Sequence, residues 1–137
     1  MTAQFQFELV SPEKLLVSKA VAMVTVPGGE GDYGVLPDHA PLITTVRPGV
    51  IDIYSEDSNT ISERIFVAGG FAEVTAERCT VLAESATPVS ELDRVKIEEH
   101  LKRLAEDMPH GHMQPEGEQV ALDKQIAIAR AQLVAIA

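Results

Sequence analysis

The chain has 137 residues and a formal net charge of −10, from 11 basic and 21 acidic side chains. This length suits one domain, or one domain with an appendage, and is long enough to bury a real core. The acidic charge disfavours nucleic-acid binding, because that binding draws its affinity from Lys and Arg against phosphate. The sequence contains no run of about 18 apolar residues and no basic N-terminal region followed by an apolar stretch. It therefore predicts neither membrane insertion nor a signal or transit peptide.

The residues before Pro88 alternate between apolar and polar in short segments. Phe5, Phe7 and Leu9 share one face of the first segment, and Ile51 and Ile53 share one face of a later segment. Glycine and proline pairs separate the segments, and Gly69 with Gly70 is predicted to shape a turn or a bulge. Short segments of period two, divided by turns, are typical of an antiparallel sandwich or barrel. We therefore predict an all-β sandwich over residues 1–87.

The hydrophobic period changes after Pro88. Ser90 is the expected N-cap of a helix whose apolar stripe contains Ile97, Leu101, Leu104 and Met108. Two prolines and two glycines in residues 108–117 end that helix, and a second one is expected over about residues 118–136. Residues 88–137 are thus predicted to form an antiparallel helical hairpin. Two short helices bury little by themselves, so the hairpin must dock on the sandwich or on a partner.

A glycine-rich motif follows the apolar segment of residues 21–26. Gly29, Gly31 and Gly34 have the spacing G-x-G-x-x-G. A dinucleotide site would need a helix to begin at the third glycine, so that its free N–H groups hold a pyrophosphate. Pro37 and Pro41 oppose a helix there. We predict a shaped, acidic surface loop; a small nucleotide-binding enzyme and a free-standing β-sandwich adaptor remain the alternative functions.

Catalytic chemistry has little support in the sequence. The four histidines, at 39, 100, 110 and 112, have no cysteine or carboxylate at metal-ligand spacing, and no serine lies in a G-x-S-x-G motif. The single cysteine, Cys79, follows an apolar alternation and is predicted to be a buried or edge thiol. The sequence therefore predicts no catalytic residues, no metal site and no cofactor.

Three motifs together resemble the epsilon subunits of F-type ATP synthases. That family carries a loop E-G-x-x-G-(V/I)-x-P-x-H-A-P-L, a (K/R)-P-G turn and a segment V-x-G-G-(F/I)-x-E-V. They match residues 30–42, 47–49 and 67–74 of this chain. The resemblance covers essentially the whole chain, including the helical hairpin. The predicted lack of a transit peptide favours the bacterial form over its mitochondrial counterpart, which is called delta.

The resemblance implies a ten-stranded β-sandwich followed by two helices, in a non-catalytic rotor subunit that couples proton flow to ATP synthesis. The implied partners are the gamma subunit and the ring of c subunits, together with the alpha and beta subunits through the hairpin. The implied location is peripheral, on the cytoplasmic face of the bacterial inner membrane. Glu30, Asp32 and His39 become the candidate contacts with the c ring, whose polar loops carry basic residues. Ser11 becomes the candidate contact with gamma.

The resemblance also implies a regulatory nucleotide site in the hairpin, since some members bind ATP through an (I/L)-D-x-x-R-A motif and a later arginine. The matching residues here are Asp93, Lys96 and Arg103, with Ile97 in place of the alanine. Lysine lacks the planar fork of arginine, and Ile97 adds bulk where the family has a methyl group. The sequence therefore predicts weak ATP binding, with a dissociation constant above about 1 mM.

Overall fold

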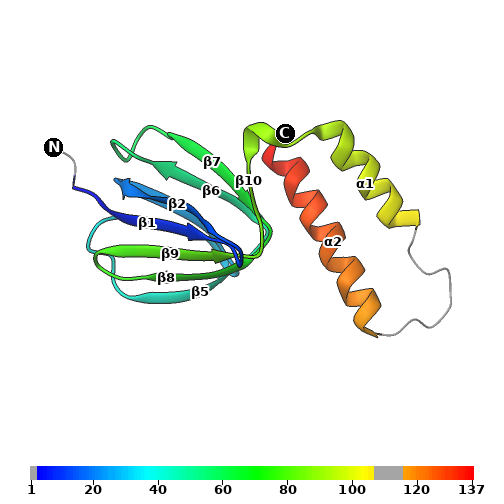
Figure 1. Ribbon diagram of the computed structural model, residues 1–137, viewed down its shortest axis with the longest axis horizontal. Helices are drawn as coiled ribbons and strands as arrows, with labels where there is room; N and C mark the ends of the chain where they lie inside the picture. Colours follow the sequence, from blue (N-terminus) through cyan, green and yellow to red (C-terminus); the bar gives the residue numbers. More distant parts are fainter. Residues whose placement is uncertain (1–2, 107–115) are drawn as a thin grey trace.

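A computed structural model describes residues 3–106 and 116–137 of the chain, with ten strands and two α-helices (Figure 1). The strands are β1 (Phe5–Val10), β2 (Leu15–Val21), β3 (Met23–Gly28), β4 (Gly31–Val35), β5 (Leu42–Val46), β6 (Gly49–Tyr54), β7 (Glu63–Val67), β8 (Gly70–Val74), β9 (Arg78–Ala83) and β10 (Ala86–Pro88). A 3₁₀ turn, η1 (Val89–Glu91), leads to α1 (Arg94–Glu106) and α2 (Glu116–Ala135). The prediction of a β-sandwich followed by a helical hairpin is confirmed.

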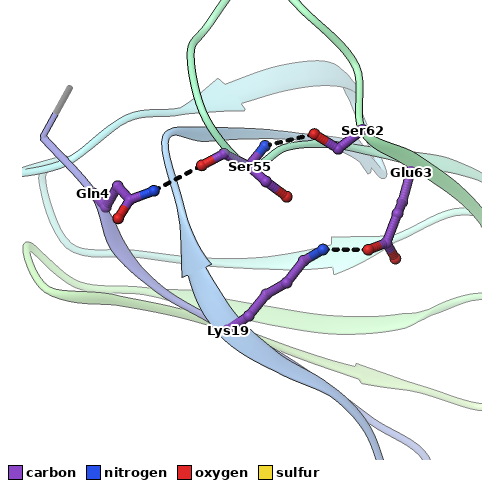
Figure 2. Close-up of polar contacts among 5 residues, drawn as sticks. All are labelled: Gln4, Lys19, Ser55, Ser62 and Glu63. Carbon is purple, nitrogen blue, oxygen red and sulfur yellow. Dashed lines mark hydrogen bonds and ion pairs between the residues drawn. The ribbon is translucent and has the colours of Figure 1, made fainter. Parts of the chain in front are cut away.

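The ten strands belong to one sheet, in the order β10-β7-β6-β3-β5-β8-β9-β1-β2, with β4 paired to β3. The sheet folds over so that its N-terminal strands approach β6 and β7. Figure 2 shows Lys19 of β2 paired with Glu63 of β7, and Gln4 Nε2 donating to the carbonyl oxygen of Ser55 at 2.7 Å. The Ser55 N–H in turn donates to Ser62 Oγ at 3.0 Å. These contacts join parts of the sheet that are far apart in sequence.

The core lies between the layers of this folded sheet. Phe7, Leu9, Ile51 and Ile53 are fully buried and belong to one cluster, as the alternation predicted. Cys79 is buried in the same cluster, and burial raises the pKa of its thiol to about 12. The interior is therefore apolar throughout the described sandwich.

Gly69 and Gly70 connect β7 to β8 in the left-handed region, with φ of 123° and 150°. A Cβ atom on Gly70 would lie 1.9 Å from the carbonyl oxygen of Leu82. Both the backbone conformation and the space therefore require glycine at position 70. In place of the predicted turn or bulge, the structure has a bend at Gly69 between two strands that do not pair with each other.

The start of the first helix differs from the prediction. Ser90 lies in η1, whereas the Asp93 carboxylate accepts hydrogen bonds from the N–H groups of Val95 (3.0 Å) and Lys96 (3.3 Å). The Asp93 carbonyl oxygen also accepts from the Ile97 N–H at 3.0 Å. Asp93 is thus the N-cap, and the prediction of Ser90 was wrong. The reason is tertiary: Leu92 is extended and packs against the sheet, so the helix begins after it.

The helical hairpin docks on the right of the sandwich in Figure 1, beside β6, β7 and β10. Phe66, Ala68 and Ala135 form a second buried cluster, which we call the docking cluster; Val50, Val89, Leu92, Ile128 and Ala131 pack around it. Ile97 and Leu104 of α1 are buried, in line with the predicted stripe, and Ile126 and Ala129 of α2 are buried as well. Met108, His110 and His112 lie outside the described residues.

Candidate functional site

The glycine-rich motif forms a β-hairpin. β3 pairs with β4 in antiparallel register from Val24 opposite Val35 to Gly28 opposite Gly31, leaving Gly29 and Glu30 at the turn. We call residues 28–32 the tip. The chain continues from the tip into a strand, so the helix that a dinucleotide site requires is not formed here. The prediction of a shaped, acidic surface loop fits this hairpin, with Glu30 and Asp32 both exposed.

The tip is held by the turn between β5 and β6. Arg47 forms an ion pair with Asp32, and Arg47 Nη1 donates to the carbonyl oxygen of Gly28 at 2.6 Å. The Gly29 N–H donates to the carbonyl oxygen of Thr45 at 3.0 Å. The loop motif and the R-P-G turn, separate in sequence, thus form one surface element.

Tyr33 ties β4 to β5 beside the tip. Its hydroxyl lies 2.6 Å from Thr44 Oγ1, at hydrogen-bond distance. Burial raises the pKa of Tyr33, and the hydrogen bond to Thr44 opposes that rise. Tyr33 therefore stays neutral near pH 7, and its hydroxyl connects β4 to β5 through the hydrogen bond with Thr44.

His39 does not lie with the two acids. β4 carries the chain away from the tip for a strand of 5 residues, and His39 follows in the next loop. Its Nδ1 donates to the carbonyl oxygen of Ala40 at 2.7 Å, and its N–H donates to that of Leu36 at 3.2 Å. The preceding Asp38 has a positive φ of 65° and donates its N–H to Ala76 at 2.9 Å. The three candidate ring contacts thus fall into two groups, one strand length apart.

Ser11, the candidate gamma contact, lies in the turn between β1 and β2. Its N–H donates to the carbonyl oxygen of Lys14 at 2.9 Å, and its hydroxyl accepts from the Lys14 N–H at 3.3 Å. The side chain is half-buried by these turn contacts. Ser11 therefore shapes the turn that leads to the exposed Leu15.

The candidate nucleotide residues do not enclose a site together. Asp93 is engaged as the N-cap of α1, and Lys96 and Arg103 are exposed, about two turns apart on one face. A groove of about 380 Å³ between the helices is instead lined by Glu98, Leu101, Lys102, Ala105, Ile126 and Arg130. Glu98 is about 200° around α1 from Lys96, so the groove lies on the far side of α1 from Lys96.

An exposed apolar patch covers the outer face of β5, β8 and β9, which lie side by side in Figure 1. Ile43, Phe71 and Leu82 are 75%, 58% and 54% exposed and line one shallow cavity of about 200 Å³. Phe71 pairs directly with Leu82 across the β8–β9 ladder. Large apolar side chains gathered on one open face mark an interaction surface. The motif search missed this patch; the available signal was large apolar residues on the polar face of alternating strands.

In the described parts of the chain, no three His, Cys, Asp or Glu side chains are grouped as a metal site would need. Nor does either described helix combine the length and apolar character needed to cross a membrane.

Comparison with known proteins adds independent information. The family model of the ATP synthase delta/epsilon chain β-sandwich domain matches residues 4–89, so the helical hairpin lies outside the matched region. The chain is 51% identical to an ATP synthase epsilon chain of Rhodospirillum centenum, over 100% of this chain and 94% of that one. It is 60% identical to that of Paramagnetospirillum magneticum, over 77% of this chain and 78% of the other.

Solved structures show the same fold. A chain in the Euglena gracilis mitochondrial ATP synthase matches with a TM-score of 0.82 and 22% identity, over 100% of this chain and 84% of that one. A chain in the Tetrahymena thermophila mitochondrial ATP synthase matches with a TM-score of 0.64 and 15% identity, over 99% and 98%. Since the family model spans more than half of the residues and the Rhodospirillum centenum relative is 51% identical across the whole of this chain, the chain belongs to the ATP synthase delta/epsilon chain family.

Proposed function

We propose that the chain is a non-catalytic rotor subunit of a proton-translocating F-type ATP synthase. In this proposal it links the gamma subunit to the c ring, couples proton flow to ATP synthesis and lies peripherally on the cytoplasmic face of the bacterial inner membrane. The relatives named ATP synthase epsilon chain support it. The single observation that carries it in the structure is the apolar patch of Ile43, Phe71 and Leu82, which needs a protein partner to cover it.

Gamma is the partner that we assign to this patch. Ile43, Phe71 and Leu82 come from three adjacent strands, so their relative positions are fixed by ladder hydrogen bonds. A rotor contact must transmit torque without yielding, and side chains on paired strands are better placed for that than side chains on a loop. An aromatic residue at the centre of an apolar patch has the character of an interface hot spot.

Replacing Phe71 with Asp tests the assignment. A charge at the centre of the patch is expected to lower the affinity for purified gamma by about 30-fold, equivalent to about 2 kcal/mol. Ile61→Asp is the matched control, because Ile61 is also an exposed apolar residue but lies outside the patch. Binding of the Phe71→Asp variant with unchanged affinity, measured by titration calorimetry, would overturn the assignment.

The ring contact is proposed for Glu30, Asp32 and His39, opposite basic residues of the c ring. The tip supports this role because its two carboxylates are exposed on a rigid hairpin. Glu30→Lys combined with Asp32→Lys is expected to weaken attachment to the ring while leaving the sandwich folded, since both positions face solvent. Normal coupling of proton pumping to ATP hydrolysis in reconstituted membranes would contradict the contact.

Regulation through the hairpin is a separate part of the proposal. The docked hairpin could release α2 toward the alpha and beta subunits, and we propose that ATP does not control this step. Asp93 is occupied by backbone N–H groups, and Lys96 and Arg103 point away from the groove between the helices. Titration of the purified chain with ATP is expected to give a dissociation constant above about 1 mM, which corresponds to a binding free energy of less than about 4 kcal/mol in magnitude. Micromolar binding that Arg103→Ala abolishes would identify a nucleotide sensor.

A further inference from the structure

The two acids of the tip differ in their surroundings. Arg47, on the turn between β5 and β6, contacts the tip hairpin through three groups. Its backbone N–H donates to the carbonyl oxygen of Pro27 at 2.9 Å, Nη1 donates to that of Gly28 at 2.6 Å, and Nη2 pairs with the Asp32 carboxylate. The planar fork of a guanidinium is suited to holding a carbonyl and a carboxylate at once. One arginine thus connects β3, the tip and the start of β4.

The Asp32 charge is matched within the chain. Its carboxylate lies against the Arg47 guanidinium, so the pair is neutral when seen from a partner. Glu30, at the apex of the turn, is exposed and forms no hydrogen bond or ion pair within residues 3–106 and 116–137. The net charge that the tip presents is therefore that of Glu30.

The backbone around Glu30 is held on both sides. On one side, the Gly29 N–H donates to Thr45, and a Cβ on Gly29 would lie 2.3 Å from Thr45 Oγ1. On the other side, Gly31 adopts φ of 147°, which favours glycine, and nothing lies within 4 Å of the Cβ it would carry. The first glycine lies close to the Thr45 side chain of β5, and the second adopts a backbone conformation that favours glycine. Together they hold the backbone on both sides of Glu30.

We infer that Arg47 is a positioning residue of the tip, that Asp32 acts through Arg47, and that Glu30 is the carboxylate that meets a Lys or Arg side chain of the c ring. This inference rests on the proposed ring contact and divides its residues by role. An exposed carboxylate on a fixed turn can form a charge-assisted hydrogen bond with a cationic partner, and such a contact weakens as salt screens it. A carboxylate already paired with arginine contributes mainly by holding the turn.

Three conservative variants of the full chain separate the roles. They are Glu30→Gln, Asp32→Asn and Arg47→Lys; the last keeps the charge but loses the fork. The measurement is the affinity of each purified chain for vesicles that carry the c ring and gamma, between about 20 and 200 mM salt. We call the contacts of Arg47 with Pro27, Gly28 and Asp32 the brace. Hydrogen exchange at the Gly29 N–H reports separately on this brace, and thermal melting checks that each variant is folded.

Glu30→Gln is expected to lower the affinity at low salt by about 3- to 10-fold and to remove most of its salt dependence, without changing exchange at Gly29. Asp32→Asn and Arg47→Lys are expected to lower the affinity less, to keep the salt dependence and to speed exchange at Gly29. Because both act on one brace, the double variant is expected to be no worse than the weaker-binding single variant.

Two results would count against the inference in different ways. If Asp32→Asn removes the salt dependence and Glu30→Gln keeps it, Asp32 is the ring contact and the assignment of roles is overturned, while the proposed function stands. If the wild-type chain attaches with no salt dependence and all three variants match it, the tip does not meet a charged ring. That result overturns the proposed contact, and the inference with it.

Discussion

The sandwich and the helical hairpin are held together in different ways. The sandwich buries large side chains completely, among them Phe7, Leu9 and Ile51, in one continuous cluster. In the hairpin, Ala129 alone of the described residues is as deeply buried, and the contact with the sheet depends on the small docking cluster around Phe66 and Ala135. The sandwich therefore has a core of its own, whereas the hairpin depends on its contacts with the sandwich. We therefore expect docking of the hairpin to be an equilibrium separate from the unfolding of the sandwich.

The largest expected effect is on the sandwich core. Leu9→Ala is expected to cost about 2–5 kcal/mol of unfolding free energy, because Leu9 is 0% exposed and its removal leaves a cavity between the layers. Urea unfolding followed by circular dichroism measures the loss. Leu15→Ala is the matched control, since Leu15 is 56% exposed on the neighbouring strand, and is expected to change stability by less than about 0.5 kcal/mol. Equal losses for the two variants would mean that the core does not lie where the strands place it.

A smaller effect is expected where the two regions meet. Phe66→Ala is expected to cost about 2 kcal/mol of docking free energy, because it removes the largest buried side chain of the docking cluster. Hydrogen exchange should become faster in α2 while the amides of β1 and β9 stay protected. Phe71→Ala serves as the control, since Phe71 lies on the opposite, exposed face and should leave exchange in α2 unchanged. Faster exchange throughout the sandwich of Phe66→Ala would show that the two regions are one cooperative unit.

The N-cap of α1 comes next in size. Asp93→Ala removes the carboxylate that accepts from Val95 and Lys96, and is expected to cost about 1 kcal/mol of hairpin stability. Ser90→Ala is the comparison, with an expected change within about 0.5 kcal/mol because Ser90 lies before the helix. The difference in exchange rates at the first amides of α1 checks both. A larger loss for Ser90→Ala than for Asp93→Ala would reinstate Ser90 as the cap.

The smallest effect is expected for the ion pair between Lys124 of α2 and Glu84 after β9. Nζ and Oε1 are 2.9 Å apart, and both side chains are about half exposed, at 53% and 52%. Lys124→Met is therefore expected to cost no more than about 1 kcal/mol of docking free energy at low salt, and less at high salt. Exchange in α2, measured in low and high salt, tests this. A loss that salt does not reduce would indicate that the methylene stem, and not the charge, supports docking.

The boundary between the sandwich and the hairpin lies near Pro88. The last strand, β10, ends at Pro88 and pairs with β7, and η1 begins at the next residue. That residues 1–87 fold independently of residues 88–137 stays a prediction. A chain ended after Val89 would test it most fairly, because such a chain keeps every strand.

Much of the fold could be predicted because its signals are local. The alternation at Phe5, Phe7 and Leu9 placed those residues on one face, and the change of period after Pro88 separated strands from helices. Pro37 and Pro41, which follow the glycine-rich motif, excluded a helix there without any knowledge of what surrounds them. Each of these features depends on residues a few positions apart, where backbone geometry alone decides which side chains share a face.

The site depended on contacts between distant segments. Asp32 and Arg47 are 15 positions apart in the sequence. They form an ion pair only because the β5–β6 turn lies against the β3–β4 hairpin. The N-cap of α1 is Asp93, and not the predicted Ser90, because Leu92 packs against the sheet. Ile43, Phe71 and Leu82 form one patch because β8 pairs with both β5 and β9. The sequence by itself thus determined the kinds of elements, their order and the family resemblance. The tertiary structure decided which charged side chains are paired and which apolar side chains contact one another. The reason is that strand order brings together residues that are far apart in the sequence, where a local pattern cannot predict the contact.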